Sequence, residues 1–362
     1  MPAAQSLDLG DDVVQLTVAL CDIESVSGNE GPLADAVEAA LADLDGLELV
    51  RTGNVVVART TLGRDERVVL AGHLDTVPLA AVPNLPTIRR GDELYGRGTC
   101  DMKGGVAVQL KLAAGLAAGP DRQTRDVTYV FYDGEEIEAV HNGLGRVARE
   151  QPTLLDADFA VLLEPSNGTV EGGCNGTMRV DVTVRGVAAH SARSWLGHNA
   201  IHEAATILTR LREYEAREVE VDGLVFREGL NAVTIRGGVA GNVIPDRCVV
   251  SVNYRFAPSA TVEQAFAHLQ EMFDGYDLEL VDAAPGARPG LDQPAAKAFV
   301  ATMGEPPRAK YGWTDVSRFS ALGVPAVNFG PGDPNLAHTD HEHVRVDQLR
   351  RCEEVLFGWL TS

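Results

Sequence analysis

The chain of 362 residues lacks the patterns that mark disulfide-rich, membrane or secreted proteins. Its five cysteines are an odd number and form no C-x-x-C pair, which argues against a disulfide framework and a zinc ribbon. No apolar run approaches the roughly 18–20 residues that span a bilayer. The first stretch, MPAAQSLDLGDD, is acidic and has neither the basic region nor the apolar core of a secretory signal. We therefore expect a cytoplasmic protein with free thiols and no membrane partner.

Basic residues are also scarce, because 31 lysines and arginines face 52 aspartates and glutamates, for a formal net charge of -21. Such an acidic chain repels phosphates, so we expect no nucleic-acid partner. It can concentrate metal cations, whereas an anionic substrate would need a local cluster of arginines. The composition is otherwise ordinary for a globular protein, at 45% hydrophobic and 23% charged, and the length suits about two domains.

The sequence has no internal repeat, and its expected strands alternate with helices of ten or more residues. This order predicts an α/β domain whose mostly parallel sheet is flanked by helices on both sides. The expected strands are residues 54–59, 67–71, 127–132, 159–163 and 326–329. The expected helices are residues 11–21, 32–43, 106–118, 295–303 and 346–360.

A different pattern interrupts this domain, because apolar residues alternate along 179–185 as in a half-exposed antiparallel strand. The elements after it are a helix at 200–213, strands at 232–237 and 247–256, and a helix at 261–273. Their order is that of a ferredoxin-like sandwich. The Pro/Gly-rich stretch 285–290 indicates a return to the first domain. We expect a discontinuous α/β domain at 1–176 and 289–362, with a smaller α+β domain inserted at 177–288.

Acidic and imidazole side chains recur where the expected strands of the first domain end. His73 and Asp75 lie two residues apart in AGHLDTVP, so an extended backbone directs both to one face. The further members are Asp101, Glu135, Glu136, Glu164 and His338. Because parallel strands end along one edge of a sheet, these side chains can converge there. Any one of them alone is better explained as a solvated surface acid or a capping histidine.

Taken together, this set predicts a metal site. Two histidines and several carboxylates around one cleft provide nitrogen and oxygen ligands suited to Zn²⁺ or a similar divalent ion. Without a cation, so many carboxylates would repel one another and take up protons. A pair of cations removes that repulsion. The glycine-rich stretch GRGTCDMKGG is not a phosphate loop, because it lacks the G-x-x-x-x-G-K-[ST] order.

The chain resembles the dizinc aminoacylase, carboxypeptidase and desuccinylase superfamily over nearly its whole length. The shared segments, in order, are HLDTVP, GRGTCDMKGG, DGEEIEAVHNGLG, LLEPSNG, AAHSARS, GGVAGNVIPD, NYRFAP and LAHTDHEHV. Within the superfamily, DGEEIEAVHNGLG, HSARSWLGHNAIH and KYGWTDVSRF are similar to the desuccinylase branch. The resemblance implies a metal-dependent hydrolase with a discontinuous catalytic domain and an inserted lid or dimerisation domain.

The resemblance also implies a role for each member of the set. Asp101 would bridge two metal ions, His73 and Glu164 would complete one coordination sphere, and Glu136 and His338 would complete the other. Zn²⁺ is the expected ion at both positions, and Co²⁺ is the expected substitute. The family pattern of a His followed four residues later by Glu selects His338 from the three histidines of HTDHEH.

Three further residues receive catalytic roles from the same resemblance. Asp75 would accept the second ring N–H of His73 and fix its orientation. Glu135 would act as the general base on the attacking water. His190 of the inserted domain would reach the active site of the other subunit and stabilise the oxyanion, which implies a homodimer. Without the resemblance, His190 is better explained as a strand-end histidine.

The implied reaction is hydrolysis of the amide bond of N-succinyl-LL-2,6-diaminopimelate, an acidic N-acyl amino acid. Arg255 and Asn242 match family positions that grip a substrate carboxylate, although an ion pair and a turn explain them equally well. Thr177, Thr314 and Asn335 match positions that line the pocket. Acetylornithine deacetylase and dipeptidase activities use the same kind of metal site and are the nearest alternatives. A binding protein that keeps the fold without catalysis is a third.

Overall fold

The computed structural model describes residues 6–362 and divides the chain into two compact units. Unit 1 comprises the chain up to Gly172 together with Pro289–Arg308 and Thr314–Ser362. Unit 2 comprises Gly173–Arg288 and the short segment Ala309–Trp313. Within the described residues, the structure contains no helix whose length and apolar character would carry it across a bilayer.

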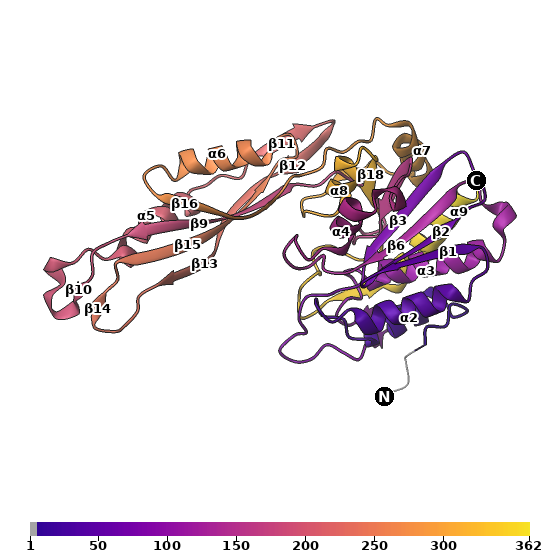
Figure 1. The fold of residues 1–362 in the computed structure, drawn as a ribbon, viewed down its shortest axis with the longest axis horizontal. Coiled ribbons are helices and arrows are strands. Elements are labelled where there is room, and N and C mark those ends of the chain that lie inside the picture. Colours follow the sequence, from indigo (N-terminus) through magenta and orange to yellow (C-terminus); the bar gives the residue numbers. More distant parts are fainter. Residues whose placement is uncertain (1–5) are drawn as a thin grey trace. The chain divides into compact units, whose positions relative to one another are not determined.

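Unit 1 is built on a mixed sheet (Figure 1). Its strands, in spatial order, are β1 (Leu47–Thr52), β2 (Val55–Thr60), β6 (Asp126–Tyr132), β3 (Arg67–His73), β7 (Phe159–Leu162), β18 (Ala326–Asn328), β8 (Glu171–Gly172) and β17 (Arg308–Ala309). The central strands β6, β3, β7 and β18 are parallel, whereas β1, β2 and β8 run antiparallel to their neighbours. The parallel centre therefore has one edge at which β3, β6 and β7 all end.

The helices of unit 1 cover this sheet, and its central strands are almost entirely buried. The helices are α1 (Val13–Asp22), α2 (Gly31–Ala42), α3 (Lys103–Ala117), α4 (Gly143–Glu150), α7 (Pro294–Met303), α8 (Val316–Ala321) and α9 (Val346–Leu360). Val68 and Leu70 of β3 belong to the core cluster that α1, α2, α3 and α9 complete. Val69 and Ala71, buried as well, point the other way. Helix α8 packs on β7 and β18 and contacts α4.

Smaller elements complete unit 1. A three-stranded sheet joins β4 (Ile88–Arg90), β5 (Glu93–Tyr95) and β19 (His343–Arg345). Two 3-10 turns lie at Pro120–Arg122 and Pro152–Leu154. Because β5 and β19 pair, the loops that follow β5 and precede β19 are neighbours, although about 245 residues separate them in sequence.

Unit 2 is an antiparallel sheet with two helices (Figure 1). Its sheet, in order, contains β13 (Gly229–Gly237), β15 (Arg247–Phe256), β9 (Gly176–Arg185) and β16 (Asp277–Ala284). Helices α5 (Ala200–Arg212) and α6 (Val262–Met272) share one apolar cluster with the buried residues of β9 and β15. Small ribbons are formed by β10 (Ala189–His190) with β14 (Val243–Ile244) and by β11 (Glu218–Val221) with β12 (Leu224–Arg227).

The predicted α/β class is confirmed, and two local differences from the expected elements have clear causes. Strand β16 was not expected, because its segment DLELVDAA contains three acidic residues, lies at a sheet edge and has no fully buried residue. Residues 309–313, expected in the first domain, belong to unit 2. There the backbone oxygen of Lys310 accepts a hydrogen bond of 3.3 Å from Asn175, and the Trp313 indole donates to the oxygen of Pro285 over 3.1 Å.

Candidate metal centre

His73 ends strand β3, and its ring is 1% exposed. Its Nδ1 lies 2.9 Å from the backbone oxygen of Asp75 and 3.5 Å from the Asp75 carboxylate, so Nε2 is left for other partners. Nε2 lies 3.2 Å from Oδ1 of Asp101 and 3.9 Å from Oε1 of Glu164. Burial opposes a charge on this ring, but hydrogen bonds to Asp101 and Asp75 outweigh it and hold the pKa of His73 well above its usual value.

Asp101 lies between two imidazoles. It occupies the loop before α3 and directs Oδ1 to Nε2 of His73 at 3.2 Å and Oδ2 to Nε2 of His338 at 3.4 Å. Burial alone would raise the pKa of Asp101, but the two histidines lower it below its usual range. A carboxylate that presents one oxygen to each of two nitrogen ligands has the arrangement of a bridging ligand.

Glu136 and His338 form the other side of this arrangement. Nε2 of His338 lies 2.9 Å from Oε1 of Glu136. Hydrogen bonds to the two carboxylates raise the pKa of His338 to about 10, and Asp101 has the larger effect. Burial first, and then the charge of Asp101, raises the pKa of Glu136. His338 adopts φ of 63°, a left-handed backbone conformation that is uncommon outside glycine.

The donor atoms fit a pair of divalent cations. The described chain contains three groups of histidine and carboxylate side chains, and within each group the possible ligand atoms lie within 4.8 Å of one another. They are His73 with Asp101 and Glu164, Asp101 with Glu136 and His338, and His73 with Glu135 and Glu136. The first two groups each hold one imidazole and two carboxylates and share Asp101. Nitrogen and oxygen donors in this ratio suit Zn²⁺ and similar ions.

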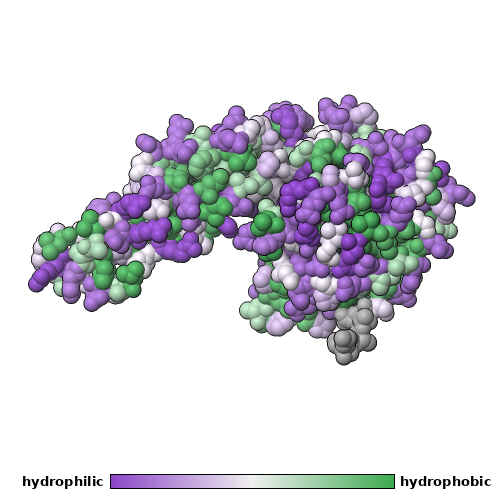
Figure 2. All heavy atoms as spheres, in the orientation of Figure 1, coloured by the Kyte–Doolittle hydropathy of each residue, from purple (hydrophilic) through white to green (hydrophobic). Residues whose placement is uncertain are grey.

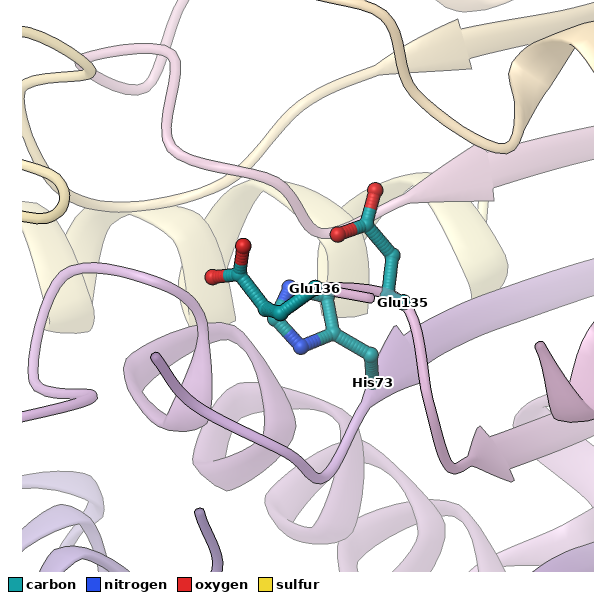
Figure 3. Close-up of side chains that lie close together, drawn as sticks. All are labelled: His73, Glu135 and Glu136. Carbon is teal, nitrogen blue, oxygen red and sulfur yellow. The ribbon is translucent and has the colours of Figure 1, made fainter. Parts of the chain in front are cut away.

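Glu135 is adjacent to Glu136 in sequence, and its side chain extends in a different direction beside the His73 ring (Figure 3). Burial is the largest influence on Glu135, and the charges of Glu136 and Glu164 add to it against the attraction of His73. The pKa of Glu135 is therefore raised well above its usual value. A carboxyl group that readily takes and releases a proton is suited to general acid–base chemistry.

Asp75 makes contacts that the sequence pattern did not indicate. Its carboxylate accepts the backbone N–H groups of Glu135 and Glu136, each over 3.0 Å, and the hydroxyl of Ser27 over 2.8 Å. Asp75 thus fixes the backbone of the segment that carries both glutamates. It also lies beside Nδ1 of His73, as expected, although its own backbone oxygen is the nearer partner.

Four of the expected site residues lie in unit 2. His190 is exposed on β10, and the backbone oxygen of Asn242, beside β14, accepts the N–H of Ser191 over 2.9 Å. His190 and Asn242 therefore belong to one ribbon. Arg255 on β15 and Thr177 on β9 are cross-strand partners in the sheet.

The other two expected substrate residues lie in unit 1. Thr314 is buried, and its hydroxyl donates a hydrogen bond of 2.9 Å to Oδ1 of Asn328. Asn335 is exposed and binds Oδ1 of Asp333 through both its backbone N–H, at 2.9 Å, and its amide nitrogen, at 2.8 Å. Their assignment to the substrate stays a prediction.

The comparisons with known proteins identify the family. Residues 69–362 match the model of Peptidase family M20/M25/M40, and the chain belongs to this family. This confirms the superfamily resemblance inferred from the sequence. The protein from Corynebacterium glutamicum named succinyl-diaminopimelate desuccinylase is 46% identical over 364 residues, which cover 98% of each chain. A Mycobacterium tuberculosis protein named "Putative succinyl-diaminopimelate desuccinylase DapE" is 56% identical over 357 residues, covering 98% of this chain and 99% of its own.

Solved structures agree on the fold. A tripeptidase from Staphylococcus aureus superposes with a TM-score of 0.78 at 20% identity and 98% coverage of both chains. A dinuclear metal-binding peptidase of the M20 family from Bacillus subtilis superposes with a TM-score of 0.70 at 17% identity and 96% coverage of both chains. The fold of this chain is therefore that of M20 peptidases.

Proposed function

We propose that the protein hydrolyses the amide bond of N-succinyl-LL-2,6-diaminopimelate to succinate and LL-2,6-diaminopimelate, in lysine and diaminopimelate biosynthesis. The proposal of a two-metal hydrolase depends on the position of Asp101, whose two carboxylate oxygens face the imidazoles of His73 and His338. The substrate is supported by the 56% and 46% identity, over nearly the full length, to proteins named for this reaction.

The residues divide the chemistry among them. His73 and Glu164 would hold one cation, Glu136 and His338 the other, and Asp101 both. When bound, the cations supply the Lewis acidity that acidifies water and polarises an amide carbonyl. We propose Zn²⁺ as the native ion and Co²⁺ as a substitute, because both accept this mixture of nitrogen and oxygen ligands.

Proton transfer falls to Glu135. Its Oε atoms take the proton from the attacking water as the new carbon–oxygen bond forms. The same proton then passes to the amide nitrogen as the carbon–nitrogen bond breaks, and the second proton of the water passes from the new carboxyl group to the amine, which leaves the ammonium form of diaminopimelate and the carboxylate of succinate. Asp75 keeps Glu135 in place through the backbone N–H. His190 would stabilise the oxyanion, and Arg255, Asn242, Thr177, Thr314 and Asn335 would bind the substrate.

We further propose a homodimer in which unit 2 supplies the contact and His190 serves the partner's site. The edge strand β13 leaves Val233 and Ile235 about half exposed, at 53% and 50%. Trp195 is 76% exposed and Val239 86% exposed near the ribbon of His190. Figure 2 shows hydrophobic residues at that end of unit 2, interspersed with hydrophilic ones. Unpaired strand edges and apolar patches are the features through which identical chains associate.

The cytoplasm is the proposed location, because the five cysteines are buried free thiols and suit a reducing compartment. The nearest alternative activity is deacetylation of N-acetylornithine. The Myxococcus xanthus protein named acetylornithine deacetylase is 29% identical over 79% of this chain. Its identity and coverage are both lower than those of the desuccinylase relatives, so we prefer succinyl-diaminopimelate.

A substrate panel tests the assignment. Purified protein is assayed with N-succinyl-LL-2,6-diaminopimelate, N-acetylornithine and a dipeptide, before and after removal of metal with EDTA. We expect the highest kcat/KM for the succinyl compound, loss of activity with EDTA and recovery with Zn²⁺ or Co²⁺. A higher kcat/KM for another member of the panel would replace the substrate but keep the hydrolase. Protein that contains no metal and cleaves nothing would support a binding role instead.

A further inference from the structure

A buried ion pair lies next to the metal centre without belonging to it. Arg97 follows β5 and Glu342 precedes β19, and their side chains are 4% and 1% exposed. Nη1 of Arg97 lies 2.6 Å from Oε2 of Glu342. Removing two charges from water is costly, and a buried pair is often no more stable than apolar residues of the same size. Stability alone is therefore a weak reason for placing this pair here.

Glu342 holds the backbone of the bridging aspartate. Its second oxygen, Oε1, accepts the N–H groups of Cys100 and Asp101, each over 3.1 Å. These two bonds fix the start of the turn from which the Asp101 carboxylate extends. The orientation of that carboxylate between the two imidazoles therefore depends on an oxygen of Glu342.

Arg97 contacts two further loops, each of which lies next to a proposed metal ligand. Its Nε donates to the oxygen of Pro78 over 3.1 Å, in the loop that follows His73. Its Nη1 donates to the oxygen of Thr339 over 3.3 Å, directly after His338. Because His338 adopts a positive φ of 63°, its backbone needs such external contacts to keep that conformation.

We propose that Arg97 and Glu342 are positioning residues that hold the half of the metal centre formed by Asp101, Glu136 and His338 in its binding geometry. This inference rests on the proposed metal site. The other half needs the pair less, because His73 ends the buried strand β3 and Glu164 lies two residues beyond β7. Asp101 and His338 lie in loops, and the pair contacts both loops.

The test compares the metal affinity of variants with that of reference proteins that lack one ligand. Metal-depleted protein is titrated with Zn²⁺ against a chelating indicator, and the Co²⁺ absorption spectrum is recorded in parallel. The test variants are Glu342→Ala and Arg97→Met. The references are His338→Ala, which lacks a ligand of one half, and Glu164→Ala, which lacks a ligand of the other half.

We expect Glu342→Ala and Arg97→Met each to lower the binding affinity for one of the two cations by roughly 10–100-fold. Loss of a group that orients metal ligands typically has an effect of this size. The cation that these variants still bind should have the affinity and the Co²⁺ spectrum of the cation retained by His338→Ala. It should not resemble the cation retained by Glu164→Ala. Glu342→Gln keeps an acceptor oxygen for the two N–H groups and should recover most of the lost affinity. If Glu342→Ala does not fold, Glu342→Gln and Arg97→Met carry the comparison.

Asp126→Asn is the matched control. Asp126 is also a buried carboxylate that accepts backbone N–H groups, those of Leu62, Gly63 and Arg64, but it lies at the start of β6. The metal-binding segment follows the other end of that strand. Asp126→Asn should lower the Tm and leave both cations bound at wild-type affinity. Equal loss of metal in this control and in Glu342→Ala would overturn the proposal in favour of a general stability effect.

The double variant Arg97→Met/Glu342→Leu separates positioning from charge compensation. It removes both buried charges together, so the Tm should recover relative to the single variants. The cation held by Asp101, Glu136 and His338 should stay weakly bound, because the N–H groups of Cys100 and Asp101 still lack their acceptor. Wild-type affinity in the double variant would refute the positioning role. If the wild-type protein itself bound no cation, the metal centre would be wrong and this inference would fail with it.

Discussion

Glu135 is surrounded by other carboxylates, and this environment determines what the residue can do. Its raised pKa follows from burial and from the neighbouring charges of Glu136 and Glu164. Glu135 belongs to neither of the two groups that share Asp101, so its carboxylate is available to move a proton.

Replacing Glu135 with Gln should therefore remove catalysis without removing metal. The amide cannot accept the proton of the attacking water, so we expect kcat to fall by roughly 10²–10⁴-fold. Metal content by elemental analysis should remain at the wild-type value. A variant that holds its metal and still releases succinate at a near-normal rate would show that another residue is the base.

Asp126 provides a pH-dependent test away from the metal centre. Burial opposes its charge, but the N–H groups of Leu62 and Arg64 and the hydroxyl of Thr60 outweigh burial and lower the pKa of Asp126. A folded-state pKa below the unfolded value gives stability that is present above about pH 4 and is lost as the pH falls through the folded pKa. Asp126→Asn should thus lower the free energy of unfolding by about 1–3 kcal/mol at pH 7.

Denaturant unfolding across pH measures this effect. The difference between Asp126→Asn and wild type should shrink below pH 4, because protonated aspartic acid and asparagine are both neutral. A difference that stays constant from pH 7 to acid would mean that the charge of Asp126 contributes nothing.

At the level of single residues, the sequence indicated the candidate ligands and one support, Asp75, but not the residues that hold the loops around them. His73, Glu135 and Glu164 each follow an apolar run, and the parallel sheet brings such strand ends together. Ser27 and Glu342 lie in turns without periodicity, and each acts through a partner far away in sequence. A single sequence contains no signal for such pairs.

The secondary-structure elements position the site through close packing at the strand ends. Helix α3 begins at Lys103, three residues before the expected start, because Gly104 and Gly105 are helical rather than part of a loop. A Cβ on Gly105 would lie 2.2 Å from the backbone oxygen of Leu163. Only glycine lets the first turn of α3 approach the segment that carries Glu164. Propensity treats a Gly-Gly pair as a loop, so this tertiary requirement could not be inferred beforehand.

Asn142 caps α4 and closes the segment that carries Glu135 and Glu136. Its Oδ1 accepts the N–H of Gly145 over 2.8 Å, and its Nδ2 donates to Oδ2 of Asp315 over 2.9 Å. Asn142→Ala should lower stability by about 1–2 kcal/mol through the lost cap. It should also reduce kcat by roughly tenfold or more, because the segment that carries the proposed base loses an anchor.

Thr261→Ala is the control for this prediction. Thr261 caps α6 in unit 2 by accepting the N–H of Gln264 over 3.2 Å, so its removal should cost about 1 kcal/mol. Thermal unfolding should report a loss in both variants, whereas kcat should change only in Asn142→Ala. Equal kcat values in the two variants would indicate that Asn142 acts on stability alone.

For the whole molecule, the expected class and the interruption of one domain by another followed from periodicity. Strand β3 of unit 1 is a buried apolar run, whereas β9 of unit 2 alternates between buried and partly exposed residues, so the change between the two was visible in the sequence. The fourth strand of the unit 2 sheet was not visible, because β16 is an edge strand with three acidic residues and no fully buried residue. Association of two copies depends on exposed surface, which the pattern of one chain does not define.

Mixed dimers test whether His190 acts on the partner's site. Glu135→Gln and His190→Ala chains are co-expressed with different tags, and only mixed dimers are purified. If His190 acts in trans, each mixed dimer has one complete site and about half of the wild-type activity. If it acts within its own chain, the mixed dimer should be no more active than either parent dimer. A protein that sediments as a fully active monomer would contradict the dimer itself.

The two imidazoles that face Asp101 differ in their access to water, because the His73 side chain is 1% exposed and that of His338 is 53% exposed. If cations occupy the proposed positions, the ion beside His338 would therefore exchange with solution faster than the ion beside His73. Under a falling metal supply, the protein would then pass through a form that keeps only the enclosed ion.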